Sequence, residues 1–156
     1  MKATLIAQLQ IAKNFFNNTT SCLTESDSDF IPSDGMFSAA QQIAHTAQTV
    51  DWFISGAFDS EGFDMDFEKH LSKISNFTSL QAARKWLTDA FEKAVEKLRS
   101  VTEAELMTPI PEGPVMGGLP RAAVINAIVD HTAHHRGALS VYCRLLGKVP
   151  KMPYGD

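Results

Sequence analysis

Four long stretches of the chain repeat apolar residues every three or four positions, and this pattern restricts the fold more than any other feature. In the 156-residue sequence these stretches cover about residues 3–22, 36–58, 80–100 and 120–146. No stretch alternates apolar and polar residues between turn signals, so a β-sheet is not expected. Four amphipathic helices in a chain of this length predict an all-α fold, a four-helix bundle.

Turn-forming residues separate the predicted helices. Thr78 or Ser79 is placed to cap the third helix, and Gly147 is placed to end the fourth. Residues 108–118 include three prolines and three glycines, which excludes a helix. That segment and the loop at 24–35 are long enough to shape the mouth of a site. Since no internal repeat or linker divides the chain, we expect one domain over residues 1–156. Between the second and third helices we expect irregular structure with a short helical turn at about 67–74.

The overall charge excludes some classes of partner. The formal net charge is −4 and no basic cluster is present, which argues against binding to nucleic acid or to an anionic membrane surface. No apolar run approaches the roughly 18 residues that a membrane span needs, and the N-terminus does not resemble a secretion signal. Two cysteines are too few for a disulfide scaffold. We therefore expect a cytoplasmic protein with reduced thiols.

Three of the five histidines lie within five residues of the predicted fourth helix, at His131, His134 and His135. His131 and His135 are four residues apart, so they share one helix face. A helical wheel centred on His131 places apolar residues around it: Val124, Ala127, Ile128, Ala138, Tyr142, Leu145 and Leu146. Two inward imidazoles cost free energy unless each finds a partner, either a hydrogen bond in the core or a shared metal ion. His134 points to the flank, where it could support the site or face a substrate.

A catalytic metal site usually has three protein ligands and one open position, so a third ligand is needed. His45 is the candidate, on a polar face of the second predicted helix that also carries Trp52. That face is either simply solvated or lines a polar cavity with Trp52 as a wall. The opposite face carries an apolar stripe: Ile43, Ala47, Val50, Ile54 and Phe58. If both faces are covered, a second protomer is one possible cover, and we therefore expect a homodimer.

The other polar residues are weaker candidates. His70 stands alone in an acidic, irregular stretch and is predicted at the surface. Asp130 is predicted to be exposed, and Arg136 to form a salt bridge with a neighbouring helix or the C-terminal tail. Cys143 is expected to be a small core residue. The sequence has no Glu-x-x-His pair and no His-Glu-x-x-His motif, so neither a ferritin-like di-iron site nor a zincin site is expected.

These residues resemble the DinB/YfiT-like superfamily over essentially the whole chain. The resemblance rests on an inward histidine in the second helix, on His-x-x-x-His-Arg-Gly at 131–137, and on the ending Lys-Met-Pro-Tyr-Gly-Asp at 151–156. It implies a four-helix bundle with one long cross-over connection, and a metal ion held by His45, His131 and His135. Many members have Gln after that glycine, where this chain has Ala138. Gln41 or Gln42 could take over its role.

The resemblance does not fix the reaction, because the superfamily includes thiol-dependent transferases and proteins described as metal-dependent hydrolases. Three neutral imidazoles leave a divalent ion with its full charge, which lowers the pKa of a bound water or thiol. We expect zinc, with nickel as the alternative, since imidazole suits both.

We expect an enzyme for a small-molecule substrate, and favour a thiol S-transferase that uses a low-molecular-weight thiol. No Asp or Glu falls on the core face beside the histidines, and this absence weakens a hydrolase, which needs a general base. The alternatives are a metal-dependent hydrolase, a non-catalytic metal-binding or stress-related bundle, and a protein-interaction module without metal.

Overall fold

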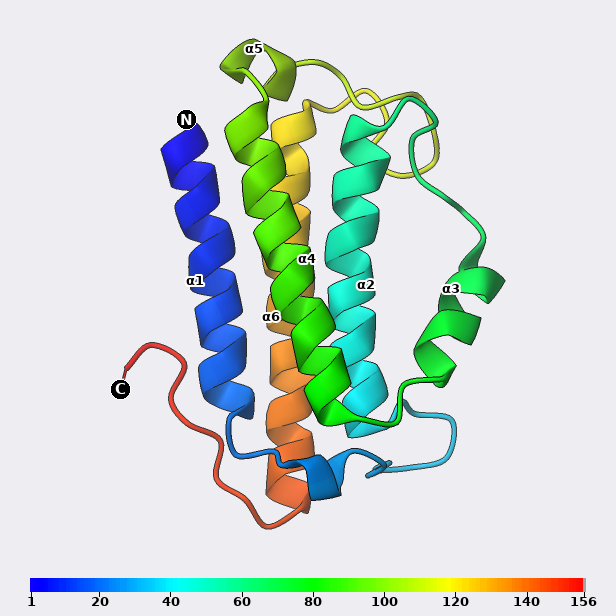
Figure 1. Ribbon diagram of the computed structural model, residues 1–156, viewed down its shortest axis with the longest axis vertical. Coiled ribbons are helices and arrows are strands. Elements are labelled where there is room, and N and C mark those ends of the chain that lie inside the picture. The colour runs from blue at the N-terminus through cyan, green and yellow to red at the C-terminus, as the bar shows by residue number, and fades with distance from the viewer. Residues whose placement is uncertain (156) are drawn as a thin grey trace.

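Four long helices lie side by side in the computed structural model, which describes residues 1–155 (Figure 1). They are α1 (Lys2–Thr20), α2 (Ala39–Phe58), α4 (Leu80–Ser100) and α6 (Val124–Leu145). The shorter helical elements are η1 (Glu25–Asp27), α3 (Phe67–Ser75), α5 (Glu103–Leu106) and η2 (Arg121–Ala123). Residues 1–155 contain no β-strand, only an isolated bridge between Pro109 and Pro120. The predicted all-α four-helix bundle is confirmed.

The helices do not follow one another around the bundle in chain order. Both α1 and α2 pack along α4 and α6, so α1 and α2 lie diagonally opposite each other. Figure 1 shows α2 and α4 running in the same direction, so the chain has to return along the bundle between them. Residues 59–79, which include α3, make this return on the outer side of α2. This segment is the long cross-over connection that the family resemblance implies.

Local side chains determine where the long helices begin and end. Ser38 Oγ accepts a hydrogen bond from the Gln41 backbone at 3.2 Å, and Gln41 Oε1 accepts one from the Ser38 backbone at 2.9 Å. This reciprocal capping box starts α2. Ser79 Oγ accepts a hydrogen bond from the Ala82 backbone at 3.1 Å and so caps α4, which decides between the two predicted caps. Gly147, with φ 72°, ends α6 as predicted. Residues 121–123 form a 3₁₀ turn, so α6 begins later than the sequence pattern indicates.

The buried face of α6 is turned relative to the predicted one. His135 and Leu139 are buried, whereas Leu145, predicted on the core side, is 60% exposed. The buried stripe is therefore centred nearer to His135 than to His131. The apolar stripe of α2 is also buried, with Ile43 and Ala47 fully enclosed in the hydrophobic core where α2 packs along α4 and α6.

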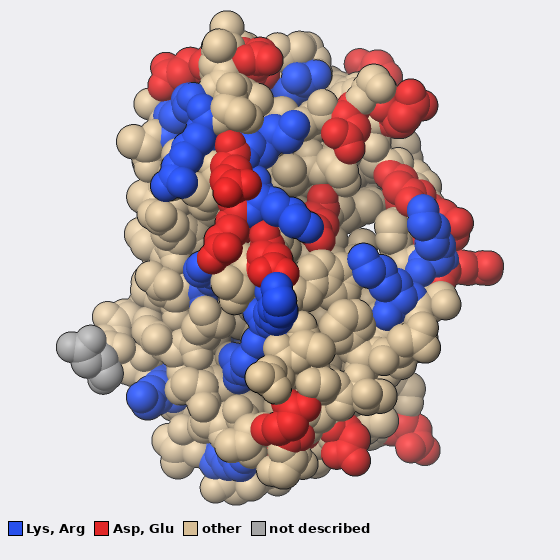
Figure 2. Space-filling view, in the orientation of Figure 1, with Lys and Arg blue, Asp and Glu red and all other residues tan. Residues whose placement is uncertain are grey.

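Charges of both signs are mixed over the face shown in Figure 2. Lys and Arg side chains alternate there with Asp and Glu, so this face has no large area of one sign. Within the described part of the chain, no helix combines the length and the apolar character needed to cross a membrane.

Candidate metal centre

His45 of α2 converges with His131 and His135 of α6 where these two helices pack together. One ring nitrogen from each of the three lies within 4.8 Å of the others. His131 Nε2 and His135 Nε2 are 2.9 Å apart, and the His45 ring centroid lies 5.3 Å and 4.8 Å from the centroids of those two rings. Ligand nitrogens of a tetrahedral zinc site lie about 3.4 Å apart, given Zn–N distances of about 2.1 Å. The cluster thus has nearly the dimensions that such an ion requires.

The structure brings the three predicted ligand residues together and leaves His134 outside. His135 is buried, and His45 and His131 are partly buried. His134 is exposed, with its ring centroid 4.9 Å from that of His135 and 6.3 Å from that of His131. It borders the cluster from the solvent side.

Burial keeps the three imidazoles neutral. Burial first, and then the charges of the neighbouring histidines, lower the pKa of His45 to about 4 and that of His135 to about 3. Burial also lowers the pKa of His131. Neutral imidazole offers one lone pair per ring, which is the form that binds a metal ion. At neutral pH the cluster is therefore chemically ready to act as a ligand set.

The Nδ1 atoms of His135 and His45 differ in their hydrogen bonding. His135 Nδ1 lies 2.9 Å from Gln42 Nε2, so Gln42 rather than Gln41 contacts the site. His45 Nδ1 is buried and has no hydrogen-bond partner among the described residues. A buried polar atom without a partner is costly, and a bound ion that organises the three rings is one way to remove that cost. The donor set and this orphaned nitrogen both fit a divalent transition metal.

A cavity of about 310 Å³ between α2 and α3 borders His45 and His131. The rest of its lining is mainly apolar: Gln48, Thr49, Trp52, Phe67, His70, Leu71 and Ile74. The polar face of α2 is thus the wall of a cavity, with Trp52 in the predicted place. Helix α3 of the same chain covers this face of α2, so a second protomer is not needed there. The homodimer remains a prediction, but this face of α2 no longer supports it.

His70 was predicted at the surface, and the structure corrects this. Its side chain is only 17% exposed and lines the cavity. Its Nε2 lies 3.1 Å from the Asp64 carbonyl oxygen and 3.7 Å from Asp64 Oδ2. The available signal was the helical spacing of Phe67, Leu71 and Ile74, because His70 falls on the same face of a helix as these three.

Other predicted residues lie away from the cavity. Asp130 is exposed, as expected. Arg136 was predicted to form a salt bridge, but within residues 1–155 it forms none; its guanidinium lies over Phe15 and over Tyr154 of the C-terminal tail, 5.7 Å and 6.0 Å from the ring centroids. Neither the loop at 24–35 nor the segment at 108–118 contributes to the cavity lining.

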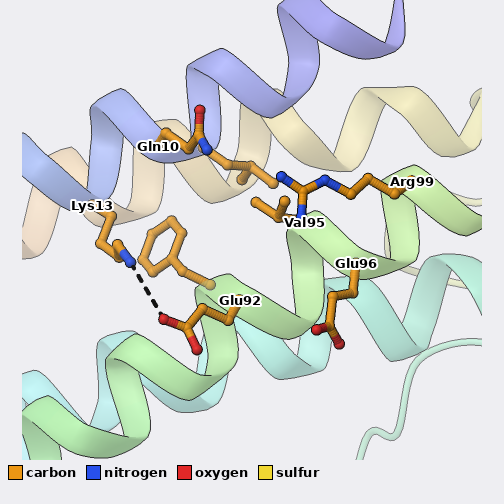
Figure 3. A pocket seen from close by; sticks show the side chains of 8 residues that line it. Gln10, Lys13, Glu92, Val95, Glu96 and Arg99 are labelled. Atoms are coloured by element: carbon orange, nitrogen blue, oxygen red, sulfur yellow. Dashed lines mark ion pairs between the residues drawn. The ribbon is translucent and has the colours of Figure 1, made fainter.

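A second hollow, of about 350 Å³, lies between α1 and α4 (Figure 3). It is lined largely by charged and polar side chains, and Lys13 Nζ lies 4.0 Å from Glu92 Oε1 across it. No histidine lines this hollow. The α2–α3 cavity, which borders two histidines of the cluster, is the better candidate for a substrate site.

Two solved structures from Bacillus subtilis resemble this fold. One is YfiT, described as a probable metal-dependent hydrolase with an unusual four-helix bundle topology; it is 18% identical with a TM-score of 0.72, covering 94% of this chain and 88% of that one. The DinB-like protein YjoA is 18% identical with a TM-score of 0.68, covering 95% of each chain. At these identities the likeness concerns the fold alone.

A protein from Streptococcus pneumoniae is 13% identical with a TM-score of 0.70, covering 93% of this chain and 91% of that one. No curated protein matches the sequence. The sequence pattern of the DinB superfamily, however, matches residues 8–139. Since this match spans most of the chain, the protein belongs to the DinB superfamily.

Proposed function

We propose that the protein is a divalent-metal-dependent enzyme in which His45, His131 and His135 hold the ion. The observation that carries the proposal is the convergence of three neutral imidazoles from two helices beside a cavity. Three protein ligands leave a position for water or a thiol. A bound divalent ion supplies a charge that makes such a water or thiol acidic enough to ionise near neutral pH. Zinc is the expected ion and nickel the alternative.

Gln42 is proposed to orient His135. For Nε2 of His135 to be a ligand, its Nδ1 must carry the proton, and the Gln42 amide must then turn so that Oε1 accepts it. The 2.9 Å separation already suits that hydrogen bond. A ring held from behind in this way keeps its lone pair directed at one point, which is the usual contribution of such partners to metal affinity.

A thiol S-transferase remains the favoured reaction. The cavity is lined by Trp52, Phe67 and Leu71, which suits the apolar part of a small electrophilic substrate. No carboxylate among residues 1–155 lines it, so a general base of that type is missing from the described lining. Transfer of a low-molecular-weight thiol to an electrophile needs no protein base once the thiol is ionised.

Hydrolysis is the second candidate, and His70 favours it. Its imidazole lines the cavity, and its contact with Asp64 fixes the ring orientation. An imidazole in this position can accept a proton from an attacking water and return it to a leaving group. YfiT, which shares the fold, is described as a probable metal-dependent hydrolase.

The metal content of tag-free protein, measured by mass spectrometry, tests the centre. We expect about one zinc or nickel ion per chain in the wild type and in His134→Ala, and almost none in His131→Ala. A wild type that takes up neither Zn²⁺ nor Ni²⁺ on incubation would contradict the proposal. Loss of metal in His134→Ala with retention in His135→Ala would contradict the ligand assignment.

Two probe reactions then separate the candidate activities. Metal-loaded protein is assayed with 1-chloro-2,4-dinitrobenzene plus cysteine, and separately with p-nitrophenyl acetate. If hydrolysis is the activity, His70→Gln should lower ester turnover by about 100-fold or more at unchanged metal content. If thiol transfer is the activity, His70→Gln should leave it nearly unchanged. A metal-loaded protein that turns over neither probe would favour a non-catalytic metal-binding bundle.

A further inference from the structure

Cys22 and Cys143 lie in direct contact, although they are 121 positions apart in the sequence. Cys22 follows the end of α1, and Cys143 lies in the last turns of α6. Both are free thiols, and their sulfur atoms are 3.2 Å apart. Neither lines the cavity beside the histidines. The prediction that Cys143 is a small core residue is confirmed, but its pairing with Cys22 is a tertiary contact that the sequence does not reveal.

The two thiols differ in accessibility. Cys22 is partly exposed, whereas Cys143 is completely buried. Burial, together with the hydrogen bond between the two thiols, raises the pKa of Cys143 to about 12. Cys143 is therefore a protonated thiol at neutral pH, and Cys22 is the sulfur that a reagent in solution meets first.

A partly buried cation, Arg84 of α4, contacts the end of α1 two residues before Cys22. The Arg84 guanidinium donates to the Thr20 carbonyl oxygen at 2.6 Å and to Thr20 Oγ1 at 3.1 Å, which anchors it near the end of α1. Burial lowers the pKa of Arg84, and negative charge on Cys143 or Cys22 would oppose that effect. The thiolate is the reactive form of a cysteine.

We propose that Cys22 and Cys143 form an oxidation site that a small hydroperoxide converts into an intramolecular disulfide. The Cys22 thiolate attacks the terminal peroxide oxygen, so that an S–O bond forms and the O–O bond breaks. The leaving alkoxide, or hydroxide in the case of hydrogen peroxide, takes up the proton that Cys22 lost when it ionised. The Cys143 sulfur then attacks the Cys22 sulfur, an S–S bond forms, and the S–O bond breaks. The released hydroxide takes the Cys143 proton as water. With hydrogen peroxide, two thiols are oxidised and one peroxide is reduced to two waters.

Formation of the disulfide requires only a small movement of the two sulfur atoms. A disulfide bond is about 2.0 Å long, so the sulfurs must approach by a little over one ångström. Cys22 lies in the turn after α1 rather than within a helix, so this approach can come from the turn while α6 stays in place. The bond would tie the connection between α1 and α2 to the end of α6 and close a long loop of the chain.

Mass spectrometry of the reduced full-length protein, treated with hydrogen peroxide, tests the site. We expect the wild type to lose about 2 Da and to give one cross-linked peptide containing Cys22 and Cys143, both reversed by dithiothreitol. Cys143→Ser should instead gain oxygen at Cys22, because the resolving thiol is missing. Cys22→Ser should leave Cys143 unmodified, because Cys143 is buried.

Three outcomes would overturn the proposal: Cys22 without modification, wild-type Cys22 that stops at sulfinic acid, or a disulfide between two chains through Cys22. Thermal unfolding adds a second readout, since a disulfide that closes a long loop should raise the Tm of the oxidised wild type but not of Cys143→Ser. His131→Ala should form the same disulfide, so this inference and the metal proposal can fail separately.

Discussion

At the scale of single residues, the candidate centre depends on how each imidazole is held. His131 and His135 share a helix face because they are four apart, which the sequence alone predicts. Sequence spacing cannot show which glutamine reaches them, because that depends on how α2 and α6 are rotated against each other. In the structure Gln41 is used in the capping box of α2, and Gln42 contacts His135. These adjacent glutamines thus have separable roles.

Replacing each glutamine tests this separation. We expect Gln42→Ala to weaken Zn²⁺ affinity by about 10- to 100-fold, because His135 loses the group that orients it. Gln42→Glu should keep tight binding, since a carboxylate can also accept from Nδ1–H. Gln41→Ala should lower stability by about 1 kcal/mol through loss of part of the cap, with unchanged affinity. Competition titration with a chelating dye measures affinity, and equal weakening by both alanine variants would contradict the assigned roles.

At the scale of elements, the sequence alone predicts the long helices, but it does not predict where α3 docks. Ser38, Ser79 and Gly147 mark helix ends through local bonds, so the sequence contains that information. The docking of α3 over His45 depends on contacts across the cross-over, and one of these involves Gly56. A Cβ at position 56 would clash with the Phe63 ring, whose centroid lies 4.6 Å from that of Trp52.

Two helical glycines should therefore respond to alanine with opposite signs. Gly56→Ala should cost about 1–3 kcal/mol, because the Phe63 ring and the cross-over must move away from α2. Gly137→Ala should gain up to about 1 kcal/mol, because no atom of residues 1–155 lies within 4 Å of its Cβ position and alanine favours a helix. Urea unfolding of both variants measures the difference, and a stabilised Gly56→Ala would contradict the packing described for Phe63.

The cover provided by α3 can be tested by filling the cavity. Leu71→Trp adds bulk to a residue that lines it, so we expect turnover of the probe substrate to fall at least 10-fold with unchanged metal content. Ser72→Trp is the matched control, since Ser72 is the next residue on α3, is exposed like Leu71 and does not line the cavity. Equal activity of the two variants would show that substrate does not use this cavity.

At the scale of the whole molecule, the order of the helices around the bundle is the part that amphipathic patterns leave open. Each apolar stripe can be buried by several arrangements of four helices, so the stripes alone do not place α1 diagonally opposite α2. The resemblance supplied the long cross-over, and the structure locates it at 59–79. This arrangement puts α2 against α6, and so brings three imidazoles into the interior, where burial opposes their protonation.

That burial should make the metal-free protein sensitive to mild acid. An unfolded chain protonates histidine near pH 6.5, whereas the pKa is about 4 for His45 and about 3 for His135 in the folded protein. The folded state binds these protons less readily, so its stability is fully present above pH 6.5 and falls as the pH drops from 6.5 toward 4. By pH 5 the loss reaches up to about 2 kcal/mol for each imidazole.

Thermal unfolding of chelator-treated protein should therefore show a lower Tm at pH 5 than at pH 7.5. The double variant His45→Gln/His135→Gln should show a much smaller difference, because glutamine does not titrate. A wild-type Tm that stays constant over this range would contradict the burial of the neutral cluster.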